Sequence, residues 1–277
     1  MKEIFNAITN IVVNLEQNVF VGYDNFVKSD LSKDEIQKDI YNYCTNIVND
    51  EFKLVTSVQS TIAQDTKETI VNNVDGKYII SYASIDSIEL LDLDFSLGSI
   101  FTVYENSIEA DSIKAVVYIT YGPTFQLVYA TKDDGVKYYS NNDGTFKEQG
   151  LLTLNEKGKI NSTAGKVNEF SEQHQNLVQS FFNEGYRLRF SNSLSMDTHQ
   201  ILFKQGGIYS SPITKSNPNG ILDVVFEAYP IAFVIELANG MAIDGKNRIL
   251  DIKSPIIDQK TPIYFGSQNE IKKVLNQ

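Results

Sequence analysis

The segment from residue 78 to residue 104 constrains the fold of this chain more than any other part of it. It begins with a short apolar strand, 78–82, and continues into a polar segment that carries Asp86 and Glu89. A second apolar strand follows at 98–104. Carboxylates at the end of a buried strand are where α/β proteins place metal and phosphate chemistry. We therefore expect a sheet here, with any active centre at its edge.

The rest of the chain alternates between helical and strand patterns. Apolar residues at helical spacing predict a helix over 4–15, and Ser32 with Glu35 three positions on predicts the start of a second helix, which runs to about 49. Four strands are predicted at 113–121, 125–129, 136–140 and 146–154, a tight hairpin at 75–76, two helices broken at Pro230 and two late strands at 249–251 and 263–265. This mixture favours an α/β architecture over a β-sandwich.

Composition excludes several classes of function. The formal net charge of -11 argues against a nucleic-acid partner, because phosphate contacts need a basic surface. One cysteine, Cys44, allows no internal disulfide and no cysteine-based zinc site. No apolar run reaches the length that spans a membrane, so we expect a cytoplasmic protein. With only two histidines, any metal must be held by carboxylates, which favours Mg²⁺ or Mn²⁺.

Motifs along nearly the whole chain resemble class I fructose-1,6-bisphosphatase. They follow that family's order and spacing: Tyr121-Gly122-Pro123, Lys157-Gly158-Lys159-Ile160, Gly206-Gly207-Ile208-Tyr209, Phe226-Glu227-Ala228-Tyr229-Pro230 and Pro262-Ile263-Tyr264-Phe265-Gly266-Ser267. The resemblance implies a layered α-β-α-β-α sandwich, built from an N-terminal half over 1–155 and a C-terminal half over 156–277. It also implies a dimer or tetramer, and Mg²⁺-dependent removal of the 1-phosphate of fructose 1,6-bisphosphate.

The resemblance carries some of the family's metal-site residues onto this sequence. The retained acidic positions are Asp39, Asp65, Asp86 and Glu227, with Asp39 matching a loop aspartate and the other three matching metal ligands. Elsewhere the pattern is broken. The family's loop reads Asp-Pro-Leu-Asp-Gly-Ser-Ser, and this chain has Ala83-Ser84-Ile85-Asp86-Ser87-Ile88-Glu89. Ala83 replaces a metal-bridging aspartate, Thr66 replaces a glutamate, and Glu89 places a negative charge where phosphate is expected.

The expected sugar-phosphate site departs further from the family. Arg189 is kept, and it is the one substrate-binding residue that we carry over. At five positions the family's hydrogen-bonding or basic residue is replaced by another: Ala164, Phe190, Ser211, Ile221 and Asp223. The pocket is therefore expected to be apolar and acidic where it should bind phosphate.

Two hypotheses follow from this pattern. The first is a catalytically inactive or impaired member of the family with a structural or regulatory role, in a homo-oligomer or in a mixed oligomer with an active paralogue. The alternative is a Mg²⁺-dependent phosphatase with an altered sugar-phosphate substrate. In it, Asp65, Asp86 and Glu227 would hold one metal ion, and Asp39, the candidate catalytic residue, would lie near a second.

Overall fold

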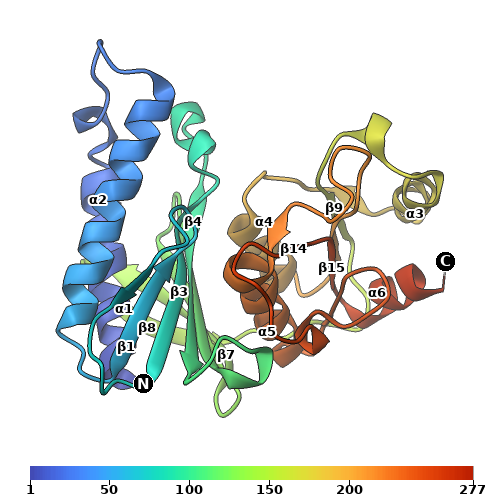
Figure 1. Cartoon of the computed structure of the whole chain (residues 1–277). Coiled ribbons are helices and arrows are strands. Elements are labelled where there is room, and N and C mark those ends of the chain that lie inside the picture. The colour runs from blue at the N-terminus through green and yellow to red at the C-terminus, as the bar shows by residue number, and fades with distance from the viewer. Residues whose placement is uncertain (277) are drawn as a thin grey trace.

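The computed structural model describes residues 1–276, which form five stacked layers (Figure 1). Helices α1 and α2 cover one face of a large sheet, and helices α4 and α5 lie between this sheet and a smaller one. Helices α3 and α6 cover the outer face of the smaller sheet. The predicted α-β-α-β-α sandwich is confirmed.

The large sheet has eight strands in the order β2-β1-β3-β4-β5-β6-β7-β8. Their bounds are β1 Val58–Ala63, β2 Thr69–Val71, β3 Tyr78–Asp86, β4 Leu97–Glu105, β5 Ile113–Tyr121, β6 Gln126–Thr131, β7 Gly135–Asn142 and β8 Thr145–Leu151. All neighbours are antiparallel except β1 and β3. Because β3 and β4 are central strands with almost every residue buried, the segment 78–104 does form the middle of the sheet.

The predicted hairpin at Asp75 and Gly76 is wrong. Strand β2 pairs with β1, and β3 also pairs with β1, in parallel, so residues 75–76 lie on a connection that crosses from one side of β1 to the other. Glycine is needed at position 76 because the backbone of β1 passes close to it, and not because the chain makes a tight turn there. A Cβ atom at this position would lie 2.5 Å from the backbone nitrogen of Gln59.

Helices α1 (Lys2–Leu15) and α2 (Lys33–Lys53) pack their apolar faces on the large sheet. The start of α2 was correctly predicted: Ser32 and Glu35 form a capping box, in which each side chain accepts a hydrogen bond from the other's backbone N–H. Cys44 lies on the buried face of α2 and is not exposed to solvent.

Helices α4 (Leu194–Phe203) and α5 (Tyr229–Leu237) form the middle layer. Pro230 lies in the first turn of α5, where its missing N–H breaks no helical hydrogen bond. The residues before it form strand β12 (Leu222–Asp223) and a π-helical turn (Val224–Ala228) instead of the second α-helix that we predicted. One hydrophobic core joins this layer to both sheets, and it includes Phe233, Ile100 and Phe265.

The smaller sheet has the order β10-β9-β11-β15-β13. Its strands are β9 Ile160–Thr163, β10 Arg187–Leu188, β11 Ile208–Ser211, β13 Met241–Ile243 and β15 Ile263–Gly266; β12 pairs separately with β14 (Lys260–Thr261), and the outer helices are α3 Glu172–Asn183 and α6 Gln268–Leu275. The predicted strand at 249–251 is a 3-10 helix, in which the successive residues Ile249 and Leu250 are both buried. Two successive apolar residues are compatible with a strand that is buried on both faces, so the sequence pattern could not exclude a strand here.

Shorter 3-10 and π-helical segments connect these elements. They are Glu16–Phe20, Tyr23–Asn25, Ile88–Leu93, Ala110–Ser112, Val167–Glu169, Val224–Ala228 and Ile249–Asp251. Within residues 1–276, no helix is both long enough and apolar enough to cross a bilayer.

Candidate functional site

The candidate site lies where β3 ends against the N-terminus of α4. Asp86 is the last residue of β3, and only 6% of its surface is exposed. Its Oδ2 atom accepts three hydrogen bonds: from the Ser195 backbone N–H at 2.6 Å, the Ser195 hydroxyl at 2.7 Å and the Ser193 hydroxyl at 2.8 Å. Ser193 is also the N-cap of α4 and accepts from the Met196 N–H. The carboxylate therefore anchors the positive end of a helix.

A second buried carboxyl group lies on the first turn of α4. Asp197 is 1% exposed, and both of its oxygens accept from the Ser191 backbone N–H at 3.2 Å. Burial raises the pKa of Asp197 to about 7 against the lowering effect of the Ser191 hydrogen bonds, and the negative charge of Asp86 contributes to that increase. Near neutral pH, this group is accordingly divided between its protonated and ionised forms.

Glu227 lies in the π-helical turn between β12 and α5. Its Oε2 atom accepts a hydrogen bond from the Asp223 backbone N–H at 2.6 Å. Burial raises the pKa of Glu227 to about 8, against the lowering effect of that hydrogen bond, and the charges of Asp86 and Asp223 add to the increase. The side chain is therefore mostly protonated at pH 7.

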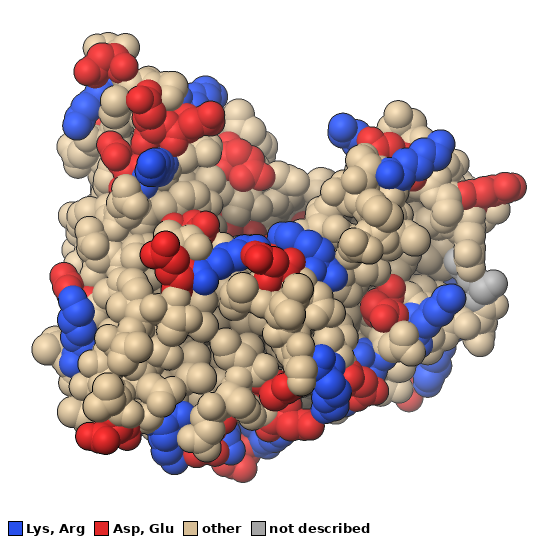
Figure 2. Space-filling view, viewed as in Figure 1, with Lys and Arg blue, Asp and Glu red and all other residues tan. Residues whose placement is uncertain are grey.

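Asp223 is the centre of an ion-pair cluster between the two sheets. Its Oδ1 atom lies 3.2 Å from the Lys67 ammonium and 2.9 Å from that of Lys260, and the Gln64 amide donates to its Oδ2 atom at 2.9 Å. Lys67 also pairs with Asp258 at 2.9 Å. Figure 2 shows acidic and basic side chains meeting across the middle of the visible face. The predicted acidic position is thus neutralised by two lysines.

The other retained positions lie towards α2. Asp65 is exposed on the turn after β1, and Asp39 is exposed on α2. Burial raises the pKa of the Tyr41 hydroxyl on α2, and the charges of Asp65, Glu89 and Asp86 raise it further. Three acidic groups from separate elements thus lie within electrostatic range of one tyrosine.

The altered positions fall into buried and exposed groups. Ala83 is 3% exposed and packs in the core between the large sheet and the middle layer. Glu89 is exposed and accepts from the Asn192 amide at 2.9 Å. Arg189 is also exposed, and its guanidinium donates to the Leu188 carbonyl oxygen at 2.8 Å. Of the remaining positions, those that are buried are Ala164 and Ser211, and those that are exposed are Thr66, Phe190 and Ile221.

The side chains present here do not fit a bound Mg²⁺ in this arrangement. Among residues 1–276, no group of three or more histidine, cysteine, aspartate and glutamate side chains is placed to share a metal ion. The buried Ala83 offers only a methyl group, and Asp86 already directs one oxygen at three donors. Magnesium requires several oxygen ligands at close to octahedral geometry.

Sequence reasoning missed five residues of this site. Lys67 lies in a charged turn, which was a usable signal, but nothing in the sequence around Lys260 indicates that it faces Asp223. Ser193, Ser195 and Asp197 follow the two-residue strand β10, and the pattern Ser-x-Ser at a helix start could have identified a capping segment.

Comparison with known proteins places this site in a family context. A protein-family model described as "Fructose-1-6-bisphosphatase, C-terminal domain" matches residues 154–277. The chain is 38% identical to fructose-1,6-bisphosphatase class 1 of Campylobacter hominis, over 99% of this chain and 98% of the relative. It is 37% identical to the protein of the same name from Campylobacter jejuni, over 99% of this chain and 94% of that one.

Two solved structures share the fold. The holo form of Leishmania major fructose-1,6-bisphosphatase superposes with a TM-score of 0.89 at 22% identity, over 99% of this chain and 92% of the other. A putative sedoheptulose-1,7 bisphosphatase from Toxoplasma gondii superposes with a TM-score of 0.85 at 20% identity, over the same shares of the two chains.

Proposed function

The chain belongs to the class 1 fructose-1,6-bisphosphatase family, and from this premise we propose that its phosphatase site no longer supports metal-dependent hydrolysis. The fold then serves a structural or regulatory role. The single observation that carries this proposal is the position of Asp86, whose Oδ2 atom is committed to three donors at the start of α4 while its neighbour Ala83 brings no ligand.

The charges of the ion-pair cluster support the same proposal. Phosphate binding needs donors and positive charge that are free to meet an anion. Here Lys67 and Lys260 are both paired with Asp223, and Ile221 is exposed and apolar. A phosphate that entered would have to displace Asp223 from both lysines and would meet its charge at close range.

We propose that the protein lies in the cytoplasm. We also propose that it forms an oligomer, either with copies of itself or with an active relative. Support for the oligomer comes from β10, the edge strand of the smaller sheet. Leu188 and Phe190 at this edge are 57% and 43% exposed, and Val167 is 66% exposed. Light scattering after size-exclusion chromatography tests this, and a monomeric protein with no affinity for an active relative would oppose it.

A metal-dependent phosphatase with an altered substrate is the second candidate. The observation that favours it is that Asp65, Asp86 and Glu89 all lie within electrostatic range of Tyr41, together with Lys260 near Glu227. In this reading, Asp65, Asp86 and Glu227 would bind Mg²⁺, and Lys67 and Lys260 would exchange Asp223 for a substrate phosphate.

Activity measurements separate the two candidates. We expect no turnover of fructose 1,6-bisphosphate, or of a panel of sugar and inositol phosphates, with millimolar Mg²⁺ or Mn²⁺. Turnover that is lost in both Asp86→Asn and Glu227→Gln would establish the second candidate instead. Two variants are needed because Asp86 also anchors α4 and its replacement weakens the fold.

Metal binding is tested without reference to activity. In the wild-type protein, we expect Mg²⁺ to leave the unfolding temperature unchanged. Ala83→Asp places a carboxylate in a position that is 3% exposed, so the variant should unfold at a lower temperature. If millimolar Mg²⁺ restores the stability of Ala83→Asp, the surrounding side chains can still bind the metal ion. The alanine at position 83 is then what prevents metal binding in the wild-type protein. A rise in the wild-type unfolding temperature with Mg²⁺ would contradict the proposal.

A further inference from the structure

A cavity of about 850 Å³ lies in the C-terminal half, away from the Asp86 site. It is bounded by the start of α3, the loop at 213–219, the turn at 244–247, the strap at 252–262 and the outer face of β15. Its volume falls within the range of pockets that bind small molecules. Lys260 and Asp258 of the ion-pair cluster reach its lining, whereas Asp86, Glu227 and Arg189 do not line it.

The floor of the cavity is aromatic and uncharged. His174 on α3 is 3% exposed, and its two ring nitrogens face the hydroxyl groups of Thr163 at 3.1 Å and Tyr264 at 3.4 Å. Burial lowers the pKa of His174 to about 4, so the ring is neutral at pH 7. Tyr264 is only partly buried and presents its ring to the cavity beside Val274.

The rim combines exposed apolar side chains with amides. Ile213 and Ile256, from two different loops, are 53% and 70% exposed. Asn219 and Gln259 add amide donors and acceptors to the lining. An apolar floor with a few convergent polar groups is the usual composition of a small-molecule site.

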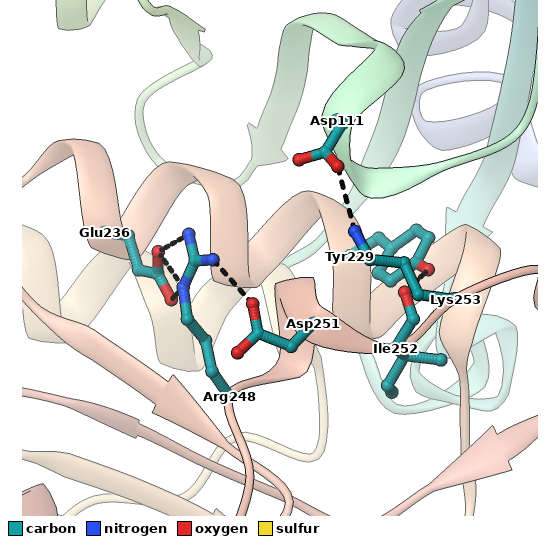
Figure 3. A network of polar contacts seen from close by, with 7 residues as sticks. All are labelled: Asp111, Tyr229, Glu236, Arg248, Asp251, Ile252 and Lys253. Atoms are coloured by element: carbon teal, nitrogen blue, oxygen red, sulfur yellow. Dashed lines mark hydrogen bonds and ion pairs between the residues drawn. The ribbon is translucent and has the colours of Figure 1, made fainter.

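The strap that forms one wall is held in place by polar contacts (Figure 3). The carbonyl oxygen of Ile252, which lines the cavity, accepts from the Tyr229 hydroxyl at 2.7 Å. Arg248 pairs with Glu236 and Asp251 on one side, and Lys253 pairs with Asp111 at 2.9 Å on the other. These contacts fix the strap to the rest of the fold, so a ligand would meet a preformed wall.

The charges at the cavity leave one cation unpaired. Asp244 accepts from the backbone N–H groups of Lys246 and Asn247 within its own turn. Asp258 pairs with Lys67, and Lys260 pairs with Asp223. Among the described residues, the Lys246 ammonium has no ion-pair or hydrogen-bond partner. An incoming anion can therefore pair with Lys246 without breaking an existing contact.

From these observations, we propose that this cavity is a binding site for a small anion that carries an aromatic or other flat apolar ring. The ring would lie over Tyr264 between Ile213 and Ile256, and the anionic group would pair with Lys246. Asp86 and Glu227 do not line this cavity, so its occupancy and the loss of phosphatase activity can be tested separately.

Three related probes test the two parts of this proposal. Phenylphosphonate carries a ring and a charge that hydrolysis cannot remove, benzyl alcohol carries the ring alone, and methylphosphonate carries the charge alone. In calorimetric titrations of the full chain, we expect saturable one-to-one binding of phenylphosphonate and weaker binding of the other two. No saturable binding of phenylphosphonate at millimolar concentration, or equal binding of benzyl alcohol, would overturn the proposal.

Matched variants locate the binding. Lys246→Ala should weaken phenylphosphonate binding about threefold to fivefold, the change expected from one exposed ion pair, and added salt should reduce the difference. Ile256→Asp should weaken it further by placing a negative charge at the rim. Lys147→Ala, an exposed lysine on β8 in the other half, and Glu227→Gln, near the Asp86 centre, should bind as the wild type does. Loss of binding in Glu227→Gln but not in Lys246→Ala would show that the anion binds near Asp86 and not in this cavity, and would refute the assignment.

Discussion

Asp197 shows at the scale of one residue how the fold changes the chemistry of a common side chain. A free aspartate is ionised above about pH 4. This one is 1% exposed, and burial raises its pKa to about 7. Since the folded-state pKa is above the unfolded one, the folded state binds the proton more tightly, and its stability falls as the pH rises between these two values.

This linkage predicts a measurable pH dependence. The free energy of unfolding should decrease as the pH rises from about 4 to about 7, and Asp197→Asn should remove part of that decrease because asparagine does not titrate. Urea denaturation at several pH values measures it. Asp133→Asn, at an exposed position, is the control and should keep the wild-type slope. A wild-type slope in Asp197→Asn would show that Asp197 is not the titrating group.

Asp223 is the second residue whose role depends on its neighbours. Its side chain is 3% exposed, whereas those of Lys67 and Lys260 are 25% and 39% exposed. Asp223→Ala should lower the free energy of unfolding by about 3 kcal/mol, the lower end of the cost of breaking a buried ion pair, because the lysines keep some water. Asp50→Ala removes an exposed pair with Lys53 and should cost less than about 1 kcal/mol. Equal costs for the two variants would mean that Asp223 is effectively solvated.

At the scale of elements, the contact between β3 and α4 is the one that shapes the candidate site. Ser193 caps α4 and also donates to Asp86, so one hydroxyl serves the helix and the strand end. Its hydrogen bond to the Met196 N–H is local, but the one to Asp86 spans 107 residues of sequence. The local part could be anticipated from a serine before a helix, whereas the distant part could not.

Ser193→Ala should therefore cost more than an ordinary capping mutation. We expect a loss of about 1–2 kcal/mol in the free energy of unfolding, since both the cap and a donor to a buried carboxylate are removed. Ser171→Ala, at the N-cap of α3, removes a cap alone and should cost about 1 kcal/mol or less. Chemical denaturation of both variants measures the difference, and a larger loss for Ser171→Ala would contradict this account.

At the scale of the whole molecule, one core connects the two sheets through α4 and α5. Phe233 on α5 is 3% exposed and belongs to the same cluster as residues from β4 and β15. Separate unfolding of the halves would expose this shared core on both sides. The division into halves at residues 155 and 156 is still a prediction about sequence organisation, but the shared core argues for one cooperative unit.

Unfolding should consequently occur in a single transition. Circular dichroism and tyrosine fluorescence, which is usable because the chain has no tryptophan, should give the same midpoint. Phe233→Ala should lower the stability by about 3–5 kcal/mol and shift both signals together. Two separate midpoints in the wild-type protein would show instead that the halves unfold independently.

The sequence by itself determined the family, the five-layer fold, the central position of the segment 78–104 and the start of α2. The family and the five-layer fold follow from the resemblance of the ordered motifs to a known family, whereas the position of the segment 78–104 and the start of α2 follow from apolar patterning and local capping. Only the tertiary structure decided that Asp86 anchors α4, that Asp223 is neutralised by Lys67 and Lys260, and that residues 75–76 cross β1. Each of these depends on groups that are distant in sequence, and local patterns carry no information about which of them meet.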